Sequence, residues 1–227
     1  IAGVNTPSGS ISESSARVDV SGQKSTNGGV SIEYADGYMS EYFVVEGAGG
    51  IATVDSGSIK NSTASGTIAG SGLYYAGGLV GKAYSPLEGL HASVDITADK
   101  YAGGLIAENN AEVTNCYATG NVETPDAYSF SGAFVGQNNG KIDYSFATGD
   151  VRNAAGFVGM NGGIVRRSYS TGDVYNASST FARQNASIIA DCYSLGNIYS
   201  QEQRLYTGFI SRYDNNATTR GFSMGSI

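Results

Sequence analysis

Apolar residues recur along this chain in units of 23 to 29 residues. Seven units begin with a large apolar residue followed by a second apolar residue, and they start at Ile51, Leu79, Leu105, Phe134, Phe157, Phe181 and Phe209. Eight positions later, six units have another apolar residue, at Ile59, Leu87, Val113, Ile142, Val165 and Ile189. The units close on Ile68, Ile96, Val122, Val151, Val174, Ile198 and Ile227. Spacing inside a unit is nearly constant, whereas the step from one unit to the next varies from 6 to 12 residues.

This pattern predicts an all-β fold, a right-handed parallel β-helix (solenoid) of about seven rungs with an N-terminal cap. Equivalent positions of successive units would stack on one another, because no rung can bury its apolar face alone. Leucine-rich repeats have a similar period, but the Leu-x-x-Leu-x-Leu pattern is absent. At about 4.8 Å per rung, seven rungs would make a rod roughly 34 Å long.

Two regions of the chain differ in pattern. Residues 1–45 do not follow the repeat, and we expect them to form a cap of lead-in strands, because the ends of a solenoid need atypical sequences. Their last part, EYFVVEG at 41–47, is apolar enough for a buried strand. Residues 46–227 are expected to form the repeats. A separate small strand domain at the N-terminus is the alternative.

The first and last apolar positions of each unit are expected to form the core. The predicted core residues include Leu79, Leu105, Phe134, Phe157, Phe181, Phe209, Val122, Val151, Val174 and Ile198. At the first turn, one position is occupied by Asn109, Asn138, Asn161 and Asn185. Asn tolerates left-handed backbone and can form amide ladders between rungs, so we interpret this column as structural.

A column of aromatic residues has an orientation that the sequence leaves open. Its members are Tyr117, Phe146, Tyr169, Tyr193 and Phe222. Side chains alternate along a strand, so in Ser168-Tyr169-Ser170 either the ring or its small neighbours face inward. The interchange of Tyr and Phe favours an inward aromatic ladder. The cysteines of the adjacent column favour the opposite orientation.

Cys116 and Cys192 occupy the same position of their units and lie three rungs apart. This separation corresponds to about 14 Å by the rung spacing. A disulfide needs Cα atoms within about 7 Å of each other. We therefore predict two free thiols that act as small apolar fillers.

The charge of the chain limits its partners. The net charge of −7 argues against nucleic acid or an anionic membrane as the main partner. Residues 1–150 carry 6 Lys and Arg against 16 Asp and Glu, whereas residues 151–227 carry 7 Arg against 4 acidic residues. We expect mostly solvated surface charge, with a polar contact by the C-terminal end as the alternative. There is no initiator Met, signal peptide or apolar run long enough to cross a membrane, so the chain resembles a piece of a larger protein.

Three stretches resemble the GLUG repeat: GGLVG at 77–81, NCYATGNV at 115–122 and the end of unit five at 163–174. That repeat occurs in immunoglobulin A1-specific zinc metallopeptidases of Gram-positive bacteria and in large bacterial surface adhesins. The resemblance implies an extracellular domain of a secreted or wall-attached protein, linked to adhesion and virulence. The second unit departs most from the repeat, with Leu90 and His91 in place of Ser-Tyr and Val94 in place of the turn Gly, so we expect a local distortion there.

The candidate catalytic residues do not form a known constellation. The chain has one His and no His-Glu-x-x-His motif, so a peptidase centre would lie outside this segment. His91 is expected to have a packing or surface role, and no Gly-x-Ser-x-Gly elbow accompanies it. Asp143, Asp150 and Asp173 are assigned to different columns, which disfavours a polysaccharide lyase or hydrolase. Four residues near one turn are expected to pair between rungs, namely Arg166, Arg167, Asp191 and Arg220. We predict no catalytic or metal site and no cofactor.

The connections of variable length are the best candidate for a binding edge, because insertions there do not disturb the core. They carry Tyr74, Tyr75, Tyr101, Tyr128, Phe130, Tyr199 and Tyr206. Aromatic side chains at an edge suit contact with a protein or a glycan. The alternative is that some of these rings fold back and cover the rod.

The sequence thus predicts a non-catalytic scaffold and recognition domain that contacts a host or neighbouring protein surface, or flanking domains of its own polypeptide. In a metallopeptidase parent it would help to engage the immunoglobulin substrate. The alternatives are an adhesin stalk or carbohydrate-binding rod and, more weakly, a polysaccharide-active enzyme.

Overall fold

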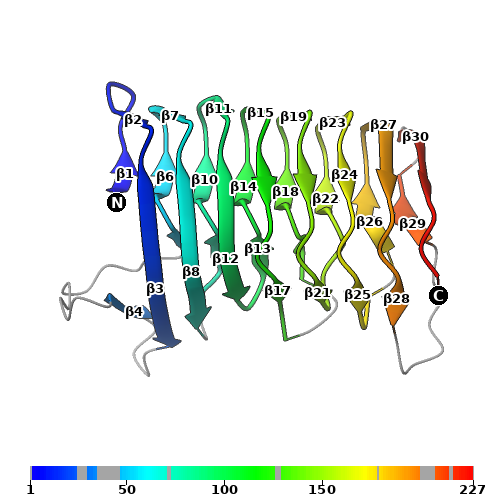
Figure 1. The fold of residues 1–227 in the computed structure, drawn as a ribbon, viewed down its shortest axis with the longest axis horizontal. Coiled ribbons are helices and arrows are strands. Elements are labelled where there is room, and N and C mark those ends of the chain that lie inside the picture. Colours follow the sequence, from blue (N-terminus) through cyan, green and yellow to red (C-terminus); the bar gives the residue numbers. More distant parts are fainter. Residues whose placement is uncertain are drawn as a thin grey trace.

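The computed structural model describes residues 2–24, 30–34, 47–70, 73–125, 129–177, 179–199, 208–214 and 217–226. Every regular element in these residues is a β-strand, and none is a helix. Equivalent strands of successive units pair in parallel, so the chain forms a parallel β-solenoid of about six turns along one axis (Figure 1). The predicted parallel β-solenoid is confirmed by this pairing. Its right-handed winding stays a prediction.

Among the described residues, the first sheet has eight strands, all parallel. They are β1 (Ala2–Asn5), β6 (Ala52–Asp55), β10 (Val80–Ala83), β14 (Ile106–Asn109), β18 (Val135–Asn138), β22 (Val158–Asn161), β26 (Ser179–Asn185) and β29 (Gly208–Tyr213). Each β-strand begins at or next to the apolar pair that starts a unit, which places that pair in this sheet.

The second and largest sheet contains the remaining parts of each unit. Its first strands are β2 (Ser10–Ser12), β7 (Ser58–Lys60), β11 (Leu87–Glu88), β15 (Glu112–Thr114), β19 (Lys141–Asp143) and β23 (Ile164–Arg166). Its next strands are β3 (Ser15–Lys24), β8 (Thr63–Gly70), β12 (His91–Thr97), β16 (Tyr117–Ala118), β20 (Phe146–Ala147) and β24 (Tyr169–Ser170). The last column is β17 (Val122–Glu123), β21 (Val151–Arg152), β25 (Val174–Tyr175) and β28 (Ile198–Tyr199). β27 (Ile188–Ser194) and β30 (Thr218–Ser223) span two of these columns.

A short third sheet is built from the connections between units. Its described strands are β5 (Gly47–Gly49), β9 (Tyr75–Gly77) and β13 (Tyr101–Gly103). Two isolated parallel bridges, Gly103–Gly132 and Gly132–Ala155, continue it along the rod. The connections are therefore partly ordered as a third face.

The N-terminal residues stack onto the first repeat. β1, β2 and β3 pair in parallel with β6, β7 and β8. β4 (Val30–Tyr34) then pairs with the end of β3 in antiparallel orientation. Residues 41–46 of the stretch 41–47 lie outside the described residues, and the boundary at residue 45 stays a prediction.

The core is a stack of apolar side chains between the sheets. Leu79, Leu105, Phe134, Phe157 and Phe181 are fully buried. The rings of Phe134, Phe157, Phe181 and Phe209 stack with centroid separations of 4.7 to 4.8 Å. The unit-closing residues Val122, Val151, Val174 and Ile198 are buried as well.

A ladder of buried amides lies beside this core. The amide Nδ2 of Asn109 donates to Oδ1 of Asn138, and Asn138–Asn161 and Asn161–Asn185 repeat the contact, each at 2.8 Å. All four side chains are fully buried. The expected amide ladder is present. None of the four has a positive φ.

The left-handed backbone lies at another corner, between β15 and β16 and at the equivalent place of other units. It is occupied by Glu13, Asn61, Gly89, Asn115, Tyr144, Arg167 and Asp191, with φ between 45° and 68°. The corner therefore accepts bulky residues in a conformation that usually favours Gly or Asn. The distortion expected in the second unit is not present, since β12 pairs with β8 residue by residue from His91 to Thr97. Register shifts occur instead between Ser179 and Ala182 and between Ala190 and Cys192.

Candidate functional site

Four of the predicted edge aromatics form a cluster on the third face. Tyr75 and Tyr101 are register partners on β9 and β13, and their rings stack at 4.8 Å. Tyr74 packs at a tilt against both, at 5.5 and 5.7 Å. The ring of Phe130 continues the stack, 5.8 Å from Tyr101. We call these four residues the tyrosine cluster.

Cations border the tyrosine cluster. Lys82 Nζ lies 3.7 Å from the Tyr75 ring centroid and also pairs with Glu108 at 3.6 Å. Lys100 Nζ lies over the Tyr74 ring and donates to its hydroxyl at 2.5 Å, and this hydrogen bond raises the pKa of Lys100. Burial raises the pKa of Tyr75. The cluster thus presents aromatic rings beside two lysines, with Tyr74 41% exposed and the other three rings half-buried.

The other edge aromatics are placed differently. Tyr199 lies on β28 in the second sheet and stacks on Tyr175 at 5.1 Å, so it does not belong to the tyrosine cluster. Tyr128 and Tyr206 lie outside the described residues. The alternative of rings covering the rod holds in part, since Tyr75, Tyr101 and Phe130 are half-buried.

The aromatic column with the open orientation faces outward. Tyr117, Phe146, Tyr169 and Tyr193 are half-buried, whereas their neighbours Ala118, Ala147, Ser170 and Ser194 are buried. The rings stack at 4.9 to 5.0 Å along the rod, and His91 and Phe222 extend the column at its ends. The inward orientation favoured by the Tyr and Phe interchange is therefore wrong. Ring faces in this outer aromatic ladder already cover one another, so mostly ring edges are left for a partner.

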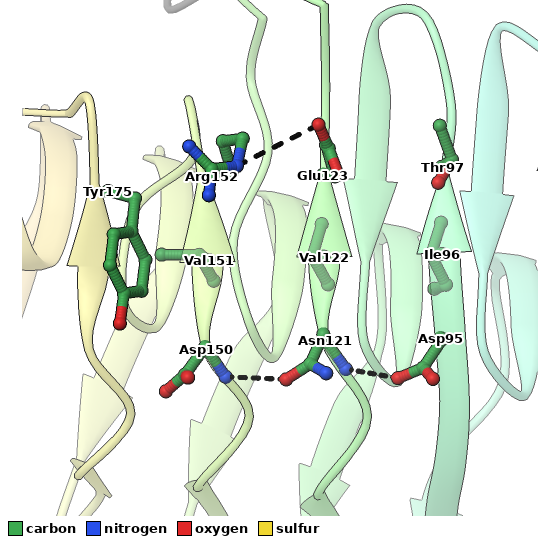
Figure 2. A pocket seen from close by; sticks show the side chains of 10 residues that line it. All are labelled: Asp95, Ile96, Thr97, Asn121, Val122, Glu123, Asp150, Val151, Arg152 and Tyr175. Carbon is green, nitrogen blue, oxygen red and sulfur yellow. Dashed lines mark hydrogen bonds and ion pairs between the residues drawn. The ribbon is translucent and has the colours of Figure 1, made fainter.

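A groove runs along the outer surface of the second sheet. It has a volume of about 460 Å³ and extends over β12, β17, β21 and β25. Figure 2 shows Asp95, Asn121 and Asp150 along one wall, with Thr97, Glu123 and Arg152 along the other. Tyr175 stands at one end, and Ile96, Val122 and Val151 lie between the walls (Figure 2). The sequence did not predict this groove, although the Asp or Asn before the closing apolar residue of units two to six is a signal that could have indicated it.

The two cysteines are free and buried, at the same position of their rungs. Burial raises the pKa of each thiol to about 12. Thiolate is the reactive form of cysteine, so neither residue is suited to nucleophilic chemistry. Their sulfurs lie against backbone carbonyls of neighbouring strands.

The charged residues at the left-handed corner pair between rungs. Both side-chain oxygens of Asp191 accept hydrogen bonds from Arg220 at 2.7 Å, which lowers the pKa of Asp191. Arg167 binds the buried carboxylate of Asp143 and lies over the ring of Tyr144. Within the described part of the chain, the Arg166 side chain forms no ion pair or hydrogen bond, although its charge also contributes to the lowered pKa of Asp191. Expected pairing is thus present for three of the four residues.

The expectation that Asp143, Asp150 and Asp173 lie in three different columns is partly wrong. Asp150 and Asp173 precede the register partners Val151 and Val174, so they lie in the same column rather than in different ones. Each holds the next rung, because Asp150 Oδ1 accepts the backbone N–H of Asp173 and Asp173 Oδ1 accepts that of Asn197, both at 2.8 Å. Asp143 lies apart, at the corner.

Over the described ranges, no three His, Cys, Asp or Glu side chains are grouped to hold a metal ion. The same ranges contain no helix of the length and apolarity that would cross a bilayer. His91 stacks on Tyr117 at 4.1 Å and lies 3.3 Å from the hydroxyl of Thr119, and burial lowers its pKa.

The chain is a parallel β-solenoid that contains a GLUG motif. Residues 98–123 match the family described as "The GLUG motif". That segment contains one full step of the solenoid, from the connection through β13, β14, β15, β16 and β17. Neither the curated proteins nor the solved structures contain a significant match to the chain.

Proposed function

We propose that this domain is a non-catalytic scaffold and recognition module of an extracellular bacterial protein, either secreted or attached to the cell wall. The observation that carries the proposal is the tyrosine cluster. It gathers Tyr74, Tyr75, Tyr101 and Phe130 from three successive connections onto one face, beside Lys82 and Lys100. Tyr is among the residue types most enriched at the energetic centres of protein interfaces.

The partner we propose is a protein surface that carries carboxylates. Lys100 lies beside Tyr74 with a phenol as its hydrogen-bond partner rather than an acid. An incoming carboxylate would gain a charge-assisted hydrogen bond from this ammonium group. The resemblance to GLUG proteins supports immunoglobulin A1 as the first partner to test, with flanking domains of the same polypeptide as further partners.

A non-catalytic role is supported by the chemistry of the described side chains. The thiols of Cys116 and Cys192 have pKa values raised to about 12. The side chain of His91 contacts a ring and a hydroxyl, with no carboxylate to orient it. Asp150 and Asp173 are engaged in holding the backbone of the next rung.

The test is binding to immobilised immunoglobulin A1 by surface plasmon resonance. We expect Tyr74→Ala and Lys100→Ala each to weaken binding by about tenfold, in line with truncation of an interface anchor. Tyr199→Ala is the matched control, since Tyr199 is a similarly exposed tyrosine outside the cluster. Equal affinities of the wild type and the two cluster variants would remove the tyrosine cluster from the proposal.

A further inference from the structure

The groove of Figure 2 differs from the tyrosine cluster in both place and chemistry. It lies on the outer face of the second sheet. The side chains that form it come from β12, β17, β21 and β25, which belong to four successive turns of the solenoid. Its floor is apolar, since Ile96, Val122 and Val151 are buried beneath it. Concave sites with an apolar body and a few well-placed polar groups are typical of ligand binding.

One wall presents a regular series of polar atoms. The backbone N–H of Asn121 donates to Asp95 Oδ1, and that of Asp150 donates to Asn121 Oδ1, at 2.8 and 2.9 Å. Asp150 Oδ1 in turn accepts from the backbone of Asp173. These bonds fix the three side chains while using only one polar atom of each. Among the described residues, nothing binds the second atoms, which are an acceptor on Asp95, a donor on Asn121 and an acceptor on Asp150.

The ring of Tyr175 closes one end of the groove and packs against Tyr199. Tyr199 stacks on Tyr175 from the C-terminal side, and Arg152 approaches from the groove side with its guanidinium 5.2 Å from the ring centroid. Arg152 is 47% exposed, and its pairing with Glu123 is long, at 3.8 Å. The guanidinium donors and the ring therefore both border the groove volume.

We infer that this groove binds an oligosaccharide of neutral or amino sugars. Sugar hydroxyls both donate and accept hydrogen bonds, which matches the alternating acceptors and donor along the Asp95–Asp150 wall. The faces of the Tyr175 ring lie against Tyr199 and Arg152, so its edge is the part that can contact the C–H groups of a sugar ring.

Two other ligand types fit less well. Three carboxylates against one guanidinium leave the groove negative, which disfavours sugars that carry carboxylates or sulfates. The groove lies on the face of a sheet rather than at its edge. The strand backbones there are bonded to adjacent rungs, so a peptide could not add to the sheet as a further strand.

The test is calorimetric titration of the whole chain with four tetrasaccharides, built from β-1,4-linked glucose, N-acetylglucosamine or glucosamine, or from α-1,4-linked galacturonic acid. We expect at least one of the first three to bind and the galacturonic acid tetramer not to bind. Asp150→Asn keeps the acceptor for the Asp173 N–H but replaces the free oxygen by an amide. This change and Tyr175→Ala should each weaken binding by about tenfold.

Matched controls come from the same repeat. Asp173→Asn alters the next carboxylate of the column, and Tyr193→Ala removes a ring of the outer aromatic ladder; neither residue lines the groove. Both controls should bind as the wild type does, and thermal unfolding checks that all variants fold. Absence of binding by the three neutral and amino tetramers, preference for the acidic one, or equal losses in the controls would overturn the inference. Tyr74→Ala should leave sugar binding unchanged, which separates this result from the test of the tyrosine cluster.

Discussion

The Asn138 side chain forms hydrogen bonds with the equivalent asparagines of both neighbouring rungs. Its Nδ2 donates to Asn161 Oδ1, while its Oδ1 accepts from Asn109 Nδ2. A fully buried amide can be tolerated only where its donors and acceptors are matched, and an identical residue one rung away supplies the match.

Asn138→Ala should therefore lower the free energy of unfolding by about 2–4 kcal/mol, because it leaves buried groups of two neighbouring amides without their partners. Urea unfolding followed by circular dichroism measures the change. Gln137→Ala, on the same strand but half-exposed, should cost less than about 0.5 kcal/mol. Similar losses for the two variants would show that the ladder adds no stability of its own.

Asp55 occupies the position equivalent to Asn138 three rungs earlier, and there the ladder is interrupted. Oδ1 accepts from Asn5 Nδ2 at 2.7 Å and from the backbone of Gly57. On the other side its register partner is Ala83, which has no amide, and Oδ2 is buried without a hydrogen-bond partner among the described residues. Burial raises the pKa of this carboxyl above its usual value.

Asp55→Asn should stabilise the fold at neutral pH. A folded-state pKa above the unfolded one means that the folded state binds the proton more tightly, so stability is greatest below the unfolded pKa and falls as pH rises through the folded pKa. The Asn variant removes this loss, and it can donate to the Gly57 carbonyl as Asn109 does to Ala111. We expect a gain of about 1–3 kcal/mol at pH 7 that shrinks toward pH 3. Thermal unfolding from pH 3 to 8 measures it, and a gain independent of pH would contradict the assignment.

At the scale of strands, the two aromatic columns show that stacking and burial are separate properties. The Phe157 ring is fully buried between those of Phe134 and Phe181. The Tyr169 ring stacks equally closely between those of Phe146 and Tyr193, but on the outer face. The hydrophobic contribution depends on the area removed from water, so the inner column should dominate.

Phe157→Ala should cost about 3–5 kcal/mol, because a large cavity is left in the core. Tyr169→Ala, with the same number of ring neighbours, should cost about 1–2 kcal/mol, mainly the lost ring contacts. Denaturant unfolding of both variants gives the comparison. Equal costs would mean that the outer aromatic ladder is as important to stability as the core.

At the scale of the whole molecule, each rung is stabilised by its contacts with the rungs on either side. Among the described residues, the parallel pairings join strands of neighbouring units, and these strands follow one another in regular order along the rod (Figure 1). A solenoid of this kind opens more easily near its ends than in its middle. The two buried thiols lie in different rungs and can report this difference.

Cys192 should react with iodoacetamide before Cys116 under native conditions. Both thiols are buried with a pKa of about 12, so their reaction requires local opening. Cys192 pairs with β30, the last described strand, whereas the rung of Cys116 lies between β12 and β20. Peptide mass spectrometry over time measures both rates, and urea-unfolded protein should label both equally. Equal rates in the native protein would indicate one cooperative unit.

The register of the rungs could be predicted because each unit keeps the same internal spacing. The spacing between the first and the closing core residue, as from Phe157 to Val174, is the same in the first six units, and strand pairing followed that alignment. The aromatic orientation could not be predicted in this way. Because side chains alternate along a strand, Ser168 and Tyr169 must face opposite sides. The alternation does not indicate which of the two sides faces the core.

The sequence by itself thus determined the solenoid class, its core columns and the amide ladder, since these depend on spacing and on local side-chain chemistry. Only the tertiary structure decided which face of the Tyr169 column meets solvent, that Tyr74 and Phe130 meet on one face, and that Asp95 and Asp150 border one groove. The reason is physical. Stacking repeats every unit along one axis, and so follows from the repeat, whereas the path of each connection depends on how it packs around the rod.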